Sequence, residues 1–436
     1  MSKILQILLI LLYLPVLFFS WFFESFEVFY LFTVIINIYL IYIFRNNQGF
    51  LLLYIFYFFY SVSLIPYYFF KIDVSSWRDF NEQIFYDKVV IIYSIFLITP
   101  LFFIKKSIPV FKDILTIPKN TNIIGFFTSC IVCVIILVWG QTGSNIIESG
   151  GYGYSINESS KSTFYEYFII FFLLSYYYSS RKRIEIIVLC VLGSLYVFKS
   201  LLFGGRIEVI ELVLLSYFIL VIDYKWIIKP IKIIIGCLLF YYLNQIFSSI
   251  RSNPVPLLQG SYTFYLDPFE SYFDSSNLYV SSNEGDVFQS SVRLIGLIEN
   301  GLLDSVTRMK AFMGFCFSIF VPTSWLPEEA SLITYKKDIY NSGGGGLIAV
   351  YFFVFLSWFG PFIISAYLFW IYRLTAFYNN LYLKFYTLMI FSTFPRWFSY
   401  NPIILFKLCL WIIPILFVFN LVLNFLKNII KKTNFI

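Results

Sequence analysis

Apolar residues occur along this chain in long runs that are separated by short polar connections. A helix that crosses a lipid bilayer needs about 20 consecutive, mostly apolar residues. By this length rule the pattern predicts about twelve crossings, of which 383–395 is the weakest because it is short and ends at Pro395. The predicted spans are 4–23, 26–44, 50–70, 89–104, 123–140, 164–180, 184–203, 207–222, 231–247, 346–370, 383–395 and 403–426.

Lysine and arginine collect in alternate connections between these spans, whereas the other connections are acidic or polar. Basic connections of membrane proteins stay in the cytoplasm. Both termini are therefore predicted to be cytoplasmic, and an even number of spans agrees with this. The basic residues concerned are Arg45, Lys105, Lys106, Lys112, Lys119, Arg181, Lys182, Arg183, Lys225, Lys229, Lys232, Arg373, Lys427, Lys431 and Lys432.

One connection is much longer than the others and divides the chain into three parts. Residues 1–247 form a predicted bundle of nine helices, 248–345 a large loop on the outer face, and 346–436 a segment with three spans. A loop of about a hundred residues is usually functional or partly folded. Its apolar stretch Ala311–Val321 is too short to cross a bilayer, so we expect a re-entrant or interfacial helix there.

The composition also indicates a protein that is embedded in lipid. Of its 436 residues 60% are hydrophobic and 13% charged, whereas soluble proteins have about 45–50% apolar and about 25% charged residues. The chain has no histidine, which excludes an imidazole base and a histidine metal site. An acid–base step must then use a carboxylate, a lysine, a tyrosine or the substrate itself. Most of the six cysteines lie in apolar spans and are interpreted as packing residues, including the pair Cys130 and Cys133.

Charged residues at membrane depth are costly and often functional. Several lie near the predicted outer boundary: Lys199, Arg206, Glu208, Glu211, Arg396 and Lys407. The tight turn Leu202–Arg206 contains two glycines, and Arg206 opens the following helix. An arginine at a helix start opposes the helix macrodipole, so we do not expect this turn to be selected for helix stability. Alternatively, Arg206 extends toward water or pairs with Glu211.

The large loop adds further charges at the same face. Arg251 directly follows the ninth span, and the loop continues with Arg293, Arg308, Glu328, Glu329 and Asp338 before a run of four glycines, 343–346. The planar guanidinium group suits phosphate oxygens, so arginines and glycines at one face indicate an anion site. The glycines alone are also consistent with a hinge, because no P-loop pattern follows them.

Taken together, these features resemble the Wzy-type O-antigen polymerases and, more loosely, the O-antigen ligases. The resemblance is carried by about twelve spans, one large outer loop in the C-terminal half, and short motifs. Those motifs are Gly204-Gly205-Arg206, Ile250-Arg251-Ser252, and the glycine-rich entry to the tenth span that ends in Phe359-Gly360-Pro361. The resemblance implies an all-α polytopic protein of the bacterial inner membrane, similar to GT-C glycosyltransferases, with a periplasmic loop.

The family's reaction is glycosyl transfer between two sugars linked to undecaprenyl pyrophosphate, without a metal or another cofactor. Fixed guanidinium groups would stabilise the departing pyrophosphate in the transition state. Arg206, Arg251 and Arg396 are the candidates for this clamp, and Lys199 and Lys407 are further candidates for binding the pyrophosphate. A carboxylate would accept the proton of the attacking hydroxyl. The candidate bases are Glu328, Glu329, Asp338 and the more buried Glu211.

Other functions are consistent with the same pattern. A ligase shares the donor but uses a different acceptor, and the missing histidine favours a polymerase over it. A flippase for lipid-linked oligosaccharide predicts charges deep in several helices and short loops at both faces. The expected partners are lipid-linked glycans, membrane lipid and, by resemblance, a chain-length regulator, and no nucleic acid.

Overall fold

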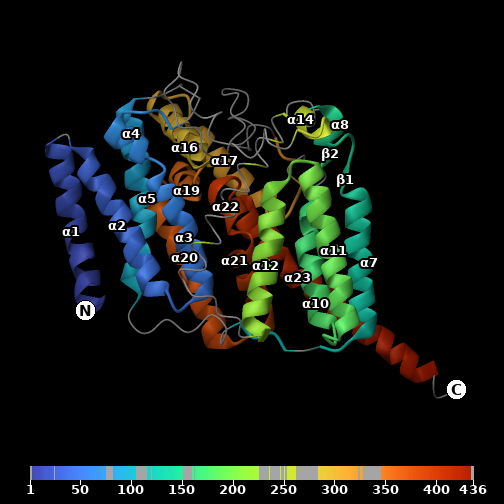
Figure 1. Ribbon diagram of the computed structural model, residues 1–436. Coiled ribbons are helices and arrows are strands. Elements are labelled where there is room, and N and C mark those ends of the chain that lie inside the picture. Colours follow the sequence, from blue (N-terminus) through green and yellow to red (C-terminus); the bar gives the residue numbers. More distant parts are fainter. Residues whose placement is uncertain are drawn as a thin grey trace. The chain divides into compact units, whose positions relative to one another are not determined.

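The computed structural model describes most of the chain, and almost all of the described residues outside turns are helical (Figure 1). The described residues are 2–23, 25–74, 82–104, 115–118, 120–150, 160–161, 163–224, 235, 246, 250, 253–261, 283–322, 325–327 and 345–433. Among them, seven helices are long and apolar enough to cross a membrane. The protein is therefore an all-α, membrane-embedded protein.

The helices gather in two compact units, and each unit takes segments from distant parts of the sequence. Unit 1 comprises 1–111, 272–378 and 394–407, and unit 2 comprises 112–271, 379–393 and 408–436. This grouping reflects packing among helices, so the predicted division at 247 and 345 stays a prediction.

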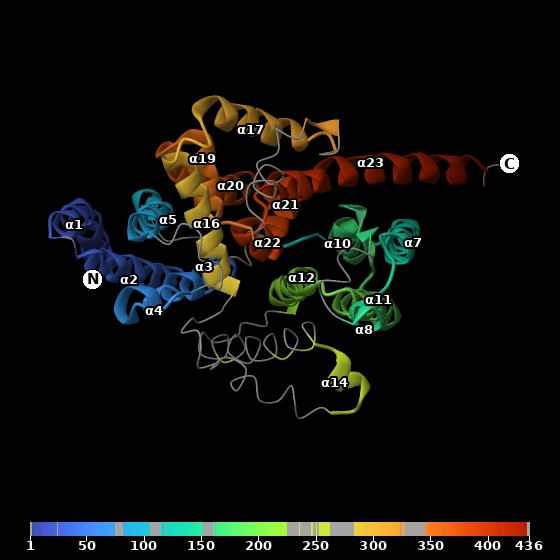
Figure 2. The ribbon, with the colours of Figure 1, turned by 90° about the horizontal axis from the view of Figure 1, so that it is seen from above.

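Unit 1 contains the N-terminal helices together with most of the helices that follow the large loop. Its elements are α1 (Ser2–Phe22), α2 (Phe26–Phe44), α3 (Gln48–Val62), α4 (Ile65–Phe70), α5 (Gln83–Phe103), α16 (Asn283–Glu299), α17 (Ser305–Ser318), α19 (Ile348–Leu356), α20 (Phe359–Tyr378), α22 (Phe394–Ser399) and the start of α23 (Ile403–Thr433). Seen from above, α5 appears end-on whereas α17 is seen along its length (Figure 2).

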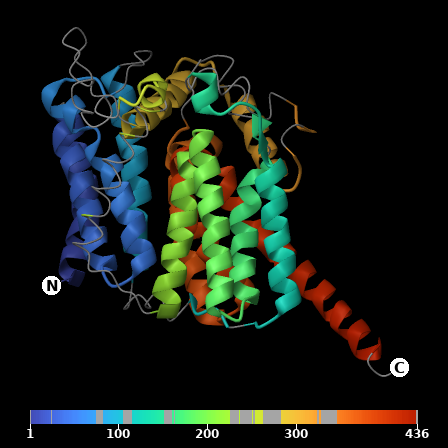
Figure 3. The same cartoon turned by 45° about the vertical axis from the view of Figure 1, so that its right-hand side comes forward.

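Unit 2 contains the middle of the chain and the remainder of α23. Its elements are α7 (Ile123–Trp139), β1 (Gln141–Thr142), α8 (Ile146–Ser149), β2 (Ser160–Lys161), η1 (Thr163–Tyr167), α10 (Phe168–Tyr178), α11 (Arg183–Leu202), α12 (Arg206–Tyr224), α14 (Val255–Leu258) and α21 (Leu381–Ser392). Helices α7, α10, α11 and α12 run side by side (Figures 1 and 3). The two short strands pair antiparallel, with Gln141 opposite Lys161.

The helix ends that adjoin three of the predicted basic connections lie together in unit 1. Near the start of α1, the Gln6 side chain donates to the Ile104 carbonyl at 3.2 Å. At the same end, Arg373 donates to the Phe103 carbonyl, and Asn47, two residues after Arg45, bonds to Tyr372. The start of α1 and the ends of α2, α5 and α20 therefore lie together, as the predicted alternation requires.

Eleven of the predicted spans overlap described helices, and four of these are divided between two helices, among them 164–180, which comprises η1 and α10. The span 50–70 is divided into α3 and α4, and 383–395 ends in the separate short helix α22. The span 231–247 lies outside the described residues except for positions 235 and 246. The total of about twelve therefore stays a prediction.

The prediction of one continuous span over 346–370 is wrong, because α19 ends at Leu356 and α20 begins at Phe359. Ser357 between them has a φ of 55°. Gly360 lies so close to the Phe352 carbonyl that there is no room for a side chain, although in a continuous helix residues eight apart are separated by about 12 Å. The backbone therefore turns sharply at Ser357, and α20 alone has the length of a span.

Candidate functional site

The turn between α11 and α12 in unit 2 contains two glycines with different roles. Gly204 has a φ of 76°, in the left-handed region that favours glycine. Gly205 donates its N–H to the Ser200 carbonyl at 2.7 Å. A Cβ atom on Gly205 would lie 2.6 Å from the Glu208 carboxylate. The Gly204-Gly205-Arg206 sequence thus lets a carboxylate lie directly against the backbone of the turn.

Glu208 and Glu211 are both buried, one turn apart on α12. Glu208 is the third residue of the helix, where a negative charge interacts favourably with the macrodipole. From Arg206 alone we expected this turn not to favour helix stability. Glu208 adds a charge of the opposite sign, which does favour the helix start. Arg206 itself is half-buried at the helix start.

Glu211 faces the other helices of unit 2. Its carboxylate is near enough to Cys409 of α23 to interact with it electrostatically. Cys409 in turn contacts Thr393, with 3.3 Å between Sγ and Oγ1. A buried carboxylate in a membrane helix calls for a structural or functional explanation. Glu211 is also the one predicted base that lies within the described part of the chain.

Lys199 stabilises the end of a neighbouring helix. Its ammonium group donates to the Leu137 carbonyl in the last turn of α7, where backbone carbonyls lack partners within their own helix. A positive charge is also favourable at a helix C-terminus. An ammonium group has three donors, so a role in pyrophosphate binding stays a prediction.

Tyr165 of η1 contacts two residues in the last turns of α11, just before this turn. Its hydroxyl lies 3.0 Å from the Ser200 hydroxyl, and its ring stacks on Tyr196 with 4.9 Å between centroids. Ser200 therefore joins η1 to the turn, because its own carbonyl accepts from Gly205. We call Lys199, Ser200, Arg206, Glu208 and Glu211 the turn cluster.

Unit 1 contains two further predicted cations, Arg396 and Lys407. Arg396 lies half-buried on α22, between buried Pro395 and Trp397. Lys407 on α23 donates to the Val321 carbonyl, just after α17, at 2.9 Å. Arg206 and Lys199 belong to unit 2, and each unit is described by itself. A clamp formed jointly by Arg206 and Arg396 therefore stays a prediction.

The sequence placed Arg293 in the outer loop without indicating its environment. In the structure it is only 1% exposed, on a helix that is buried over most of its length. Its positive charge acts on Tyr86 of α5, and Tyr86 donates to Gln289, one turn before Arg293. The signal for this helix was present in its acidic first turn, Glu284 and Asp286, which is typical of a helix N-terminus.

Two of the four loop glycines have a packing role. Gly345 contacts the backbone of Tyr400 and Ser399 so closely that there is no room for a Cβ atom. A Cβ atom on Gly346 would lie 3.4 Å from the Ser291 hydroxyl, which accepts the N–H of Leu347 at 2.9 Å. These glycines thus bring the chain close to α22 and α16. Gly343 and Gly344 lie outside the described residues, so a hinge stays an alternative interpretation.

The remaining predicted site residues, Arg251, Glu328, Glu329 and Asp338, lie outside the described residues. Within the described ranges, no group of three or more cysteine, aspartate or glutamate side chains is placed to hold a metal ion. Cys130 and Cys133 on α7 are buried free thiols.

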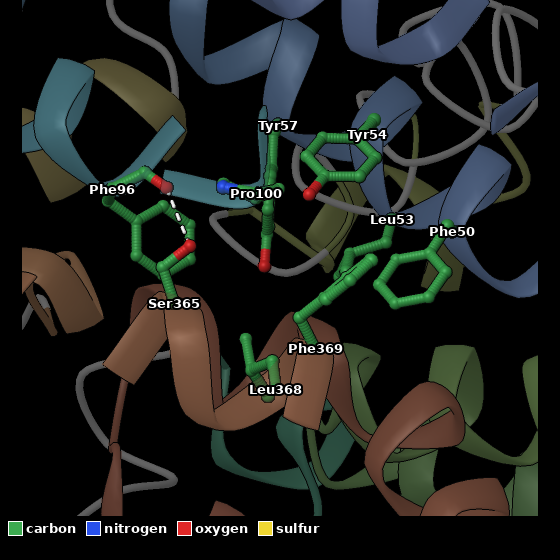
Figure 4. Close-up of a pocket in the computed structure, with 9 residues that line it drawn as sticks. All are labelled: Phe50, Leu53, Tyr54, Tyr57, Phe96, Pro100, Ser365, Leu368 and Phe369. Atoms are coloured by element: carbon green, nitrogen blue, oxygen red, sulfur yellow. Dashed lines mark hydrogen bonds between the residues drawn. The ribbon is translucent and has the colours of Figure 1, made fainter. Parts of the chain in front are cut away.

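A small cavity in unit 1 is not a substrate site. It lies between α3, α5 and α20 and has a volume of about 10 Å³ (Figure 4). That is room for about one water molecule, far too little for a sugar. The Tyr57 hydroxyl, buried in this region, points toward it (Figure 4). The lining residues are Phe50, Leu53, Tyr54, Tyr57, Phe96, Pro100, Ser365, Leu368 and Phe369.

The chain matches no protein-family model, no curated protein and no solved structure. The function is therefore inferred from the residues themselves.

Proposed function

We propose that the chain is a metal-independent glycosyltransferase of the O-antigen polymerase type. The observation that carries this proposal is the turn cluster, in which Arg206 and the buried carboxylates Glu208 and Glu211 follow a glycine turn. A guanidinium group and a carboxylate are the two groups that transfer from a pyrophosphate-linked sugar requires.

In this reaction a hydroxyl oxygen of the acceptor sugar attacks the anomeric carbon of the donor. The bond from that carbon to the pyrophosphate oxygen breaks, and its electron pair leaves with undecaprenyl pyrophosphate. A carboxylate accepts the hydroxyl proton. Arginine forks bind the departing pyrophosphate, whose negative charge grows in the transition state.

We assign the leaving group to Arg206, with Arg251, Arg396, Lys199 and Lys407 as further contributors. Glu211 is our choice of base among the described residues because it is buried on the helix that Arg206 opens. Glu328, Glu329 and Asp338 are the alternatives. The proposal places the site at the periplasmic face of the bacterial inner membrane, with about twelve spans and cytoplasmic termini.

The proposal is tested by Arg206→Ala, with Arg183→Ala as the matched control at the opposite end of α11. We expect Arg206→Ala to abolish long O-antigen chains at normal protein abundance, because a neutral side chain cannot stabilise the leaving pyrophosphate. Arg183→Ala should retain the normal ladder on a lipopolysaccharide gel. A normal ladder with Arg206→Ala would remove Arg206 from the mechanism.

A flippase is the second candidate, because buried carboxylates such as Glu208 and Glu211 are also typical of transport pathways. Deletion of the gene distinguishes the candidates. A polymerase deletion should leave a single repeat unit on lipopolysaccharide, whereas loss of that unit indicates a ligase or a flippase.

A further inference from the structure

Helix α17 has an apolar face that points away from the rest of unit 1. Five large apolar side chains on this face are between 53% and 70% exposed. They follow one another at intervals of three and four residues, which places them on one side of a helix and the turn after it. They are Val306, Met309, Met313, Phe317 and Phe320. The exposed Lys310 lies at the edge of this face, and a lysine in such a position packs its apolar stem on lipid while its ammonium group extends to water. A row of this kind is not compatible with an aqueous surface, because burial of each such side chain contributes about 1.5–3 kcal/mol.

The opposite face of α17 is attached firmly to unit 1. Arg308 donates to the Val354 carbonyl at 2.7 Å and to the Phe353 carbonyl at 3.2 Å, at the end of α19. Lys407 binds the Val321 carbonyl beyond the other end of α17. Between these ends, Ala311 is buried. The exposed face is thus held in a fixed direction.

Aromatic contacts pack α17 against the helices that cross the membrane. The Phe315 ring lies 5.7 Å from Phe406, and Phe406 lies 5.3 Å from Tyr367 of α20. Tyr367 is eight residues after Phe359, which puts it about 12 Å along the spanning helix α20. The middle of α17 therefore packs on the start of α23, within two ring contacts of a residue more than two turns into α20.

Exposed aromatic residues also lie next to the point where α17 is attached. Trp358 and Phe359 are exposed at the start of α20, only a few residues from the Arg308 contact at Val354. Helix α17 has 14 residues, about 21 Å, which is too short to cross the hydrocarbon core of about 30 Å. In the view from above, α17 is seen along its length whereas α5 is seen end-on, so the two helices run in different directions (Figure 2).

We propose that α17 is embedded in one leaflet without crossing the bilayer, and that its exposed face binds lipid acyl chains. The centre of the predicted outer loop then lies in lipid and not in water. This inference depends on the membrane setting alone and is independent of the proposed glycosyl transfer.

Native Cys316 supplies the test, because it is exposed on α17 beside Phe317. The full chain, with Cys316 as its only cysteine, is labelled there with an environment-sensitive fluorophore and reconstituted in phosphatidylcholine–phosphatidylglycerol vesicles. Quenching is then measured with nitroxide-labelled lipid and with aqueous iodide. We expect several-fold stronger quenching by the lipid nitroxide than at an aqueous reference position, and several-fold weaker quenching by iodide.

Two matched references calibrate the measurement in a Cys316→Ser background. Asn300→Cys, exposed in the turn before α17, reports on water, and Val191→Cys, exposed on the spanning helix α11, reports on lipid. Met313→Cys repeats the test on α17 if a label at Cys316 disturbs folding. Iodide quenching equal to that at position 300 would overturn the inference. Protection from both quenchers would also overturn it, since another protein segment or a second copy would then cover this face.

Discussion

At the scale of single residues, the turn between α11 and α12 depends on the left-handed backbone of Gly204, whose φ is 76°. A residue with a Cβ atom is strained in this conformation. We expect the Gly204→Ala variant to lose about 1–3 kcal/mol of stability. Gly193→Ala on α11 is the control, because there a methyl group would meet its nearest neighbour at an ordinary 3.5 Å. Thermal unfolding in detergent should separate the two variants, and equal melting temperatures would contradict this account of the turn.

The same turn offers a residue-scale test of the proposed base. Glu211→Gln keeps the size of the side chain but removes the proton-accepting carboxylate. We expect long-chain product to fall by two or more orders of magnitude, in line with about 10²–10⁴-fold for general base catalysis. The measurement is single-turnover transfer between lipid-linked repeat units by purified protein. Unchanged transfer, with melting temperature preserved, would shift the role to Glu328, Glu329 or Asp338.

At the scale of elements, the contact between α5 and α20 compensates for a proline. Pro100 has no N–H, so the Phe96 carbonyl one turn earlier lacks its usual helical donor. Ser365 of α20 donates to that carbonyl instead, at 2.7 Å (Figure 4). An unpaired backbone carbonyl in lipid is costly. The proline thus ties the stability of α5 to one hydroxyl of α20.

This compensation predicts a coupling between two substitutions. We expect Ser365→Ala to lower the free energy of unfolding by about 1–3 kcal/mol, because the Phe96 carbonyl loses its donor. In a Pro100→Ala background the backbone N–H returns, so the same substitution should have a much smaller effect. A double-mutant cycle of melting measurements gives the coupling directly. Additive effects would show that Ser365 does not replace the missing helical bond.

The break between α19 and α20 shows what the apolar pattern alone could not reveal at this scale. Residues 346–370 are apolar throughout, so hydropathy predicts one span. The sharp turn depends on contacts made far away in the sequence, because Arg308 binds the carbonyls at the end of α19. Gly360, interpreted as part of a family motif, permits the close approach of Phe352.

At the scale of the whole molecule, orientation is the property that most needs measurement. We expect reporter fusions after residues 45 and 183 to be cytoplasmic and a fusion after residue 300 to be periplasmic, because lysine and arginine mark the cytoplasmic connections. Paired reporters that are active on opposite sides of the membrane check each position. A cytoplasmic reporter at 300 would invalidate both the periplasmic site and the proposed function.

The membrane character and most helix positions follow from the sequence by itself, because length and hydrophobicity suffice to define a helix in lipid. Sequence also indicated the importance of the turn at Gly204 and Gly205, since glycines permit a sharp turn and the arginine after them opposes the helix macrodipole. Only the tertiary structure revealed the burial of Arg293, the packing role of Gly345, and the task of Lys199 at the end of α7. These features depend on contacts between residues that are distant along the chain, and the local pattern of apolar and polar residues does not predict such contacts.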